Sequence, residues 1–243
     1  MRFHMEFSYD GSKYFGYQKQ PRKKTIQSEL QKALKKINDG KKVYVSASGR
    51  TDAGVHALCQ HAHFDMKINI KPLNLCRALN SLLPDDIYVK KISEVSDDFH
   101  ARFNVKKKTY MYIINMGEYN PIEKDYVYQY NKKLDVSSME QALKYLLGNH
   151  NFKSFVKSEA DDIDYVRTIL DYSIVQDNDK IIISITGTGF MRYMVRNIVG
   201  TLIDIGSSKY EPNYIKEILK YEDRKKAGKC APACGLYLKD VYY

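Results

Sequence analysis

Apolar and polar positions in the first hundred residues alternate in four short runs and recur at helical spacing in two longer ones. Alternation is typical of half-buried strands, and the predicted strands are Phe3–Tyr9, Val43–Val45, His61–Ile68 and Tyr88–Ile92. One helix, capped by Thr25 and ended by Gly40, separates the first two strands; another, from Pro72 to Pro84, separates the last two. This order of elements is that of a split βαβ unit, the ferredoxin-like arrangement.

The second half of the chain follows a similar plan. Its predicted strands are Phe103–Ile114, Thr168–Val175 and Lys180–Thr186. Its predicted helices begin at a capping box of Ser138 with Gln141, run along an apolar stripe from Met194 to Ile203, and run from Pro212 to Leu219. The stretch from Asn151 to Asp164 is predicted to be a long loop. We therefore predict an α+β fold with two subdomains, residues 1–102 and 103–243.

The net charge of the chain indicates which class of molecule it binds. The 243 residues contain 39 Lys and Arg against 29 Asp and Glu, a formal net charge of +10. Such an excess favours a polyanion such as a nucleic acid. No apolar run is long enough for a membrane span, and the first residues do not resemble a secretion signal, so we expect a cytoplasmic protein. The four cysteines are expected to be reduced thiols.

One loop concentrates polar and small residues between two predicted strands. The segment Ser48-Gly49-Arg50-Thr51-Asp52-Ala53-Gly54-Val55-His56-Ala57 contains a single carboxylate, that of Asp52. We expect Gly49 and Gly54 to supply conformations that other residues adopt only at a cost, and so to fix the direction of this carboxylate. Composition alone is equally typical of an ordinary turn.

Two segments combine aromatic and basic side chains, as single-stranded RNA recognition requires. One is the glycine-punctuated loop of residues 9–20. The other places Lys106, Lys107 and Lys108 before a strand on which Tyr110 and Tyr112 face the same side. With 21 tyrosines in the chain, each of these rings could equally fill the core or the surface.

Cysteines and histidines are the candidate metal ligands of this chain. On a strand, Cys59, His61 and His63 would point to one face, and Cys230 and Cys234 are four residues apart. Tetrahedral sites usually have a tighter paired spacing. We therefore expect no metal, and interpret these groups as hydrogen-bonded strand histidines and buried thiols.

Two arginines lie one turn apart at the margin of the apolar stripe after Gly189, at Arg192 and Arg196. Their guanidinium groups could remain in water. Alternatively, an arginine at the edge of a buried face can reach inward to a carboxylate. The residues alone leave both interpretations open.

Several unbroken strings resemble motifs of the TruA family of tRNA pseudouridine synthases. They are Gly-Arg-Thr-Asp-Ala-Gly-Val-His-Ala at 49–57, His-Ala-Arg-Phe at 100–103 with Lys-Thr-Tyr-Met-Tyr at 108–112, and the Phe-x-x-x-x-Val-Arg-Asn block at 190–197. The resemblance implies that Asp52 is the catalytic group, that Tyr110 stacks on the target base and that Arg196 pairs with Asp52. Since the target uridine must leave its stack, we assign steering or gap-filling to Arg50. Tyr17 departs from the family, which usually has Trp there, and we expect little functional change because an aromatic face is kept.

The resemblance also implies the architecture and the reaction. It predicts two ferredoxin-like halves sharing a mostly antiparallel sheet, with helices on one face and a basic RNA cleft on the other. It predicts a homodimer that converts uridines 38, 39 and 40 of the tRNA anticodon arm to pseudouridine, with no cofactor and no metal. Another structured RNA such as ribosomal RNA, a non-catalytic RNA-binding module, and a zinc hydrolase built on Cys59, His61 and His63 remain alternatives.

Overall fold

The computed structural model describes residues 1–157 and 164–243, which form two compact units. The first unit comprises residues 1–106 and 237–243, and the second comprises residues 107–236. The loop predicted from Asn151 to Asp164 lies largely outside the described residues, and its described part contains a short 3-10 helix, η1 (Lys153–Phe155). In the described part of the chain, no helix is long and apolar enough to cross a lipid bilayer.

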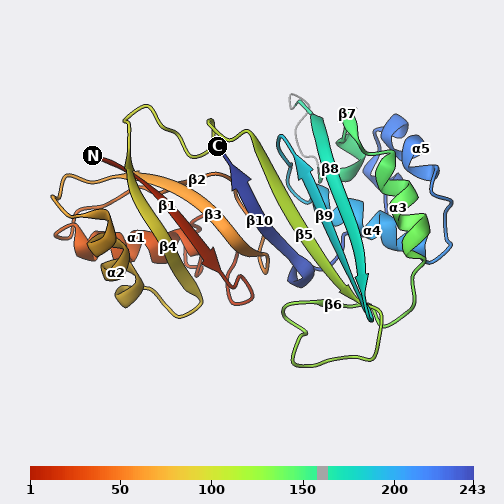
Figure 1. Cartoon of the computed structure of the whole chain (residues 1–243), viewed down its shortest axis with the longest axis horizontal. Coiled ribbons are helices and arrows are strands. Elements are labelled where there is room, and N and C mark those ends of the chain that lie inside the picture. Colours follow the sequence, from red (N-terminus) through yellow and green to blue (C-terminus); the bar gives the residue numbers. More distant parts are fainter. Residues whose placement is uncertain (158–163) are drawn as a thin grey trace. The chain divides into compact units, whose positions relative to one another are not determined.

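The first unit is built on an antiparallel sheet of order β4-β1-β3, with two further strands on β3 (Figure 1). Its elements are β1 (Arg2–Tyr9), α1 (Ile26–Ile37), β2 (Ser46–Ala47), β3 (His56–Asp65), α2 (Pro72–Leu82), β4 (Ile87–Val95) and β10 (Leu236–Tyr242). Short β2 pairs antiparallel with the distal part of β3, and β10 pairs parallel with its first residues. The ferredoxin-like order of the first unit is confirmed.

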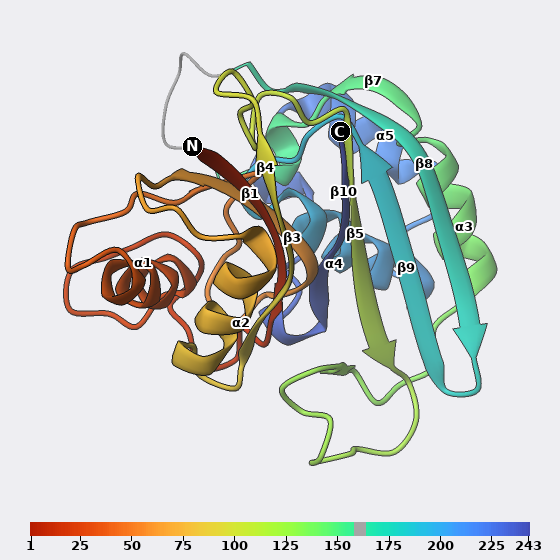
Figure 2. The same cartoon turned by 60° about the vertical axis from the view of Figure 1, so that its left-hand side comes forward.

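Helices α1 and α2 lie on one face of this sheet (Figure 2). That face of β1 carries Phe3, Met5 and Phe7, all without exposed surface. Thr25 caps α1 as predicted, with its hydroxyl accepting from the amide of Ser28. The opposite face of β1 carries His4 and Glu6, which are only partly buried. One face of the sheet is thus apolar and covered by helices, and the other is polar.

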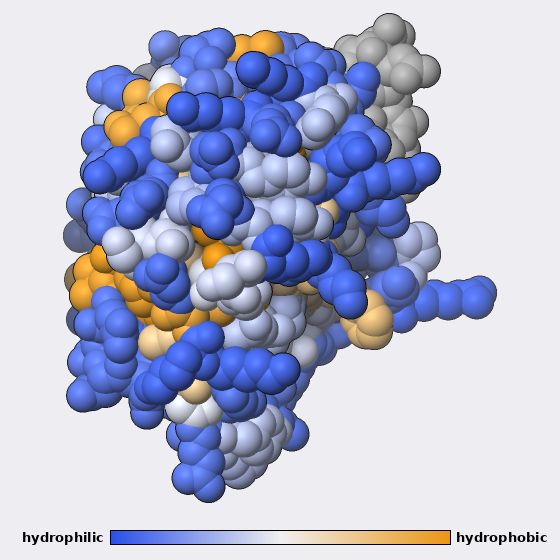
Figure 3. Space-filling model, turned by 90° about the vertical axis from the view of Figure 1, so that its right-hand side faces the viewer, coloured by the Kyte–Doolittle hydropathy of each residue, from blue (hydrophilic) through white to orange (hydrophobic). Residues whose placement is uncertain are grey.

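The second unit contains an antiparallel sheet of order β5-β9-β8-β7, with β6 parallel to the end of β5. Its elements are β5 (Lys107–Asn115), β6 (Tyr128–Gln129), α3 (Val136–Lys144), β7 (Gly148–Asn151), β8 (Val166–Asp177), β9 (Lys180–Gly187), α4 (Met194–Gly206) and α5 (Tyr214–Tyr221), with 3-10 turns η2 (Arg224–Lys226) and η3 (Ala233–Gly235). The mixed α+β class is confirmed. The surface in Figure 3 is mostly hydrophilic, with apolar surface in small areas.

Several local predictions were wrong, among them the bounds of β3, which is His56–Asp65 rather than His61–Ile68. The second strand is Ser46–Ala47 rather than Val43–Val45, because Val43 and Val45 are buried in a segment without ladder hydrogen bonds. Helix α3 is capped by Asp135, whose carboxylate accepts from the amide and the hydroxyl of Ser138. Ser138 therefore lies inside the helix, because Asp135 is the better placed acceptor for the free amides of the first turn.

Helix α4 is in backbone contact with the segment of residues 228–231. A Cβ at Gly200 would lie 1.7 Å from the carbonyl oxygen of Lys229, and the amide of Gly228 donates to Thr201 Oγ1 at 2.8 Å. The carbonyl of Arg196 accepts from the amide of Ala231 at 3.1 Å. Only glycine at position 200 permits this approach.

We predict that Gly200→Ala destabilises the protein by about 1–3 kcal/mol or more, because overpacking against backbone outweighs the gain of about 1 kcal/mol in helix propensity. Gly189→Ala is the control, since its nearest neighbour would be an ordinary 3.7 Å contact with the Arg167 side chain. Urea unfolding of both variants measures the difference. Equal stability of the two variants would contradict the packing argument.

Candidate functional site

The loop that carries Asp52 connects β2 to β3 and is anchored at its start by a buried glutamine. The Ser48 amide donates to the His61 carbonyl at 2.7 Å, and its hydroxyl donates to Gln60 Oε1 at 2.6 Å. Gln60 has no exposed surface, and its amide nitrogen donates to the Gly49 carbonyl at 3.2 Å. One side chain therefore ties both residues before Arg50 to the neighbouring strand.

The end of the loop is a tight turn. The Val55 amide donates to the Asp52 carbonyl at 3.2 Å, and Gly54 has a φ of +76°, which favours glycine. The prediction for Gly54 is confirmed. The same prediction for Gly49 was wrong, because Gly49 does not adopt a positive φ; its carbonyl instead accepts from Gln60.

A second loop, residues 10–20, lies directly on the first. The Tyr17 amide donates to the Thr51 carbonyl at 3.1 Å, and the Gly54 amide donates to the Tyr14 carbonyl at 3.3 Å. These two bonds flank Asp52 in the sequence, so its backbone is held from the side as well as from both ends.

Glycines in the second loop permit this contact. A Cβ at Gly11 would lie 1.9 Å from the Val55 carbonyl oxygen. Gly16 has a φ of +89°, and a Cβ there would lie 2.9 Å from the Thr51 carbonyl oxygen. At Gly11 and at Gly16 the backbone of one loop is in contact with the backbone of the other. A residue with a side chain at either position would therefore displace the Asp52 loop.

The aromatic residues of the second loop have two different roles. Tyr14 and Tyr17 are buried, at 3% and 2% exposure, whereas Phe15 is 52% exposed with Lys23 Nζ 4.9 Å from its ring centre. The Tyr17 ring therefore belongs to the core, and the expectation that its replacement of Trp changes function little stays a prediction. In the described part of the chain, its hydroxyl has no hydrogen-bond partner.

Polar contacts complete the surroundings of the Asp52 loop. The hydroxyls of Tyr9 and Thr51 lie 2.8 Å apart and are buried. The ring of His56 stacks on Tyr237 with centres 4.8 Å apart. Its Nδ1 lies 3.1 Å from both the Gly11 amide and a carboxylate oxygen of Asp10, so it accepts from the amide when neutral and donates to the carboxylate when protonated.

The four predicted site residues are divided between the two units. Asp52, half-buried, and Arg50, exposed, share the loop of the first unit. Tyr110 lies on β5 of the second unit, with its ring edge-to-face with Phe190 at 5.1 Å. Arg196 lies in the first turn of α4.

Arg196 is fixed within the second unit. Its Nε donates to the Ala231 carbonyl at 2.7 Å, and its guanidinium lies 5.3 Å from the ring centre of Tyr193. Tyr193 precedes the helix with a φ of +64°, a costly conformation for a non-glycine residue. Arg192 lies before the helix, with its guanidinium 4.9 Å from the same ring. The segment at 231 thus positions the arginine head group.

Sequence reasoning missed Gln60, Tyr193 and Ala231. Gln60 carried a signal, since it is a polar residue on the strand face that packs beneath the helices. Tyr193 carried no such signal, because a left-handed backbone conformation is common for glycine and enriched for asparagine and aspartate, but not for tyrosine. Ala231 acts through its carbonyl, which every residue type possesses.

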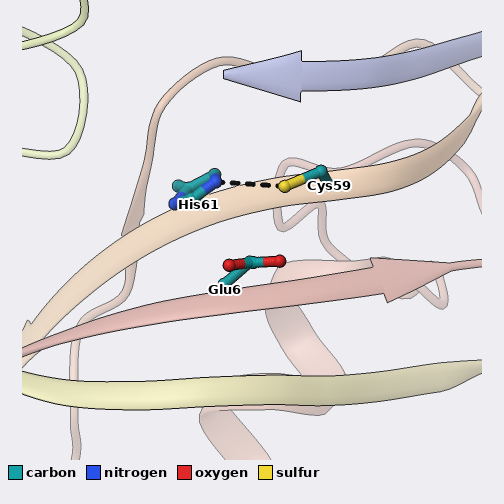
Figure 4. A group of neighbouring side chains, drawn as sticks. All are labelled: Glu6, Cys59 and His61. Carbon is teal, nitrogen blue, oxygen red and sulfur yellow. Dashed lines mark hydrogen bonds between the residues drawn. The ribbon is translucent and has the colours of Figure 1, made fainter. Parts of the chain in front are cut away.

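The predicted face of β3 is correct, but the grouping of side chains on it is not. His63 Nδ1 accepts from the Ala101 amide at 3.1 Å, and its ring contacts His100 at 4.5 Å. Cys59 and His61 are joined instead by Glu6 of β1, and the donor atoms of the three lie within 4.8 Å of one another (Figure 4). The trio could hold a metal ion.

Comparison with known proteins gives a consistent result. A family model described as tRNA pseudouridine synthase matches residues 6–104 and 142–243. The chain is 43% identical over 237 residues to tRNA pseudouridine synthase A 1 of Bacillus cereus, covering 97% of this chain and 96% of that one. It is 46% identical over 242 residues to tRNA pseudouridine synthase A of Anoxybacillus flavithermus, covering 100% and 98%, and 46% identical over 240 residues to tRNA pseudouridine synthase A 2 of Clostridium perfringens, covering 98% of each.

We predict that removing the hydroxyl group from each of two buried tyrosines beside the Asp52 loop changes the stability of the protein in opposite directions. Tyr17→Phe should stabilise the protein by about 1 kcal/mol, because it removes a buried hydroxyl without a partner among the described residues. Tyr9→Phe should destabilise it by about 1 kcal/mol or more, because it leaves the buried Thr51 hydroxyl unpaired. Thermal unfolding of both variants tests this. A loss of stability in Tyr17→Phe would show that its hydroxyl has a partner.

Proposed function

We propose, from the premise that this chain belongs to the tRNA pseudouridine synthase family, that it isomerises uridine to pseudouridine at positions 38, 39 and 40 of the tRNA anticodon arm. The observation that carries the proposal is the family match over residues 6–104 and 142–243, which includes the loop of Asp52. That loop is fixed by backbone hydrogen bonds, as a reacting carboxylate requires.

The reaction rearranges one nucleoside. The C1′–N1 glycosidic bond breaks, the uracil turns, and C5 bonds to C1′. The proton on C5 is lost and N1 gains one, so the atoms balance without oxidation, reduction or water. A single carboxylate acting at C1′ or at C6 suffices as nucleophile, and we assign that role to Asp52.

Asp52 must stay ionised when RNA excludes water from around it. Burial raises the pKa of a carboxyl group, and a guanidinium within about 4–6 Å lowers it. We assign this task to Arg196. Its fixation by the Ala231 carbonyl and the Tyr193 ring supports the assignment, because a pre-positioned cation loses little freedom on engaging a carboxylate.

The remaining roles concern RNA. The target uridine must leave its stack, and we assign Tyr110 to hold the base and Arg50 to steer the strand or fill the gap. Exposed aromatic rings beside cations support RNA binding: Phe15 with Lys23, and Phe103, 75% exposed, with Arg102 5.8 Å from its ring centre. A basic cleft and a homodimer belong to the same proposal.

Tritium release from tRNA labelled at C5 of uridine tests the proposal. Asp52→Asn should lower the rate by about 10³-fold or more, as loss of a nucleophile does, while tRNA binding is retained. Asp39→Asn is the control, since Asp39 is exposed after α1 with a φ of +48° that asparagine also adopts. Equal release by wild type and Asp52→Asn would refute the catalytic assignment.

Mapping the modified uridines in the same reaction tests the substrate. Modification confined to positions 38, 39 and 40 supports the anticodon arm. Modification of ribosomal RNA alone would replace that substrate. Binding of tRNA with no release by the wild-type protein would favour a non-catalytic RNA-binding module.

A further inference from the structure

Three ligand-type side chains meet on the polar face of the first unit, opposite the helices. Glu6 of β1 is paired directly with His61 of β3, so both side chains lie on the same face of the sheet. Cys59 is two residues before His61 and joins that face. Figure 4 shows Glu6 on β1 facing the neighbouring Cys59 and His61 on β3. The strand register, rather than a flexible loop, sets their spacing.

The distances fit one small cation. Cys59 Sγ and His61 Nε2 are 3.2 Å apart, and the ligand atoms of all three residues lie within 4.8 Å of one another. Zinc bonds of about 2.3 Å to sulfur and about 2.0–2.1 Å to nitrogen place the two atoms about 3.5 Å apart in a tetrahedral site. A shift of a few tenths of an ångström therefore suffices for Cys59 and His61, and the Glu6 carboxylate would have to move closer to them.

His61 is prepared as a ligand by a second histidine. His4 Nε2 lies 2.9 Å from His61 Nδ1, and the rings stack with centres 5.0 Å apart. With its proton on Nδ1, His61 donates to His4 and turns the lone pair of Nε2 toward the thiol. Metal-bound histidines commonly have their second nitrogen held in this way.

The charges also suit a divalent cation. Binding of a metal ion would release the thiol proton of Cys59, because the thiolate is the form that binds metal. The thiolate and the Glu6 carboxylate would then balance two positive charges. Lys90 Nζ forms an ion pair with the Glu6 carboxylate at 4.0 Å and donates to the Leu58 carbonyl at 2.6 Å.

We propose that Glu6, Cys59 and His61 bind one Zn²⁺ ion, with a fourth position open to water or to a further ligand. Thiolate, imidazole and carboxylate together suit zinc better than magnesium or calcium, which prefer oxygen ligands alone. The ion would cross-link β1 to β3, the strand that follows the Asp52 loop. This revises the expectation that the chain has no metal site, and it does not depend on the isomerase activity.

The experiment uses the full chain without an affinity tag, stripped by a chelator and titrated with Zn²⁺ by calorimetry and with Co²⁺ by absorbance. We expect one ion per chain and a thiolate-to-cobalt charge-transfer band. Cys59→Ser should abolish the band, and Glu6→Gln should weaken binding by about tenfold or more. Cys76→Ser is the matched control, because Cys76 is a half-buried thiol on α2 that donates to the Val89 carbonyl.

Thermal unfolding without metal checks that each variant folds, and Asp52→Asn should bind Zn²⁺ like the wild type. This separates the metal site from the proposed function. Absence of stoichiometric binding by the wild type would overturn the proposal. So would undiminished binding by a folded Cys59→Ser, or loss of binding on Cys230→Ser, which would place the metal in the second unit.

Discussion

Contact between two stretches of backbone is the constraint on which the first unit's candidate site depends. Residues 11–17 lie so close to residues 51–55 that a Cβ at Gly11 would fall 1.9 Å from a carbonyl oxygen. The two hydrogen bonds across this contact, from Tyr17 and from Gly54, fix the backbone on each side of Asp52. Side-chain packing alone would leave a loop of small residues mobile, because such residues bury little apolar surface. Because these glycines have no side chain, the two stretches of backbone can come into contact, and this contact holds the loop rigid.

The second unit also contains a backbone-to-backbone contact that a glycine permits. Gly200 allows the segment at 228–231 to lie against α4, and that segment returns a carbonyl to the Arg196 guanidinium. In each unit the side chain with a proposed role, Asp52 or Arg196, therefore lies on backbone that other backbone holds in place. Such contacts tolerate no added methyl group at the glycine, and they leave the chemistry of the neighbouring side chains free to serve the substrate.

Sequence pattern predicted the regular elements well where apolar periodicity was strong. The strand Phe3–Tyr9 and the helix capped by Thr25 follow from burial and capping, which act locally. Predictions failed where a nearby partner decided the outcome. Helix α3 is capped by Asp135 and not by Ser138, which lies three residues later. Gly49 kept ordinary backbone angles because Gln60, on the next strand, satisfies its carbonyl. The loop motif identified Asp52, but the contacts that hold it come from residues 9–17 and 60, which no local pattern connects.

The polar face of the first sheet shows why some sites escape sequence reasoning altogether. His4, His61 and Tyr243 come from the two ends of the chain and from its first quarter, yet Tyr243 lies 5.2 Å from one imidazole ring and 5.3 Å from the other. The Tyr243 hydroxyl donates to the Ala101 carbonyl at 2.7 Å, which holds the end of the chain beside this face. Desolvation in this environment lowers the pKa of each histidine. The surroundings of these two imidazole rings are therefore set by residues far apart in the sequence, and no local pattern connects Tyr243 with His4 or His61.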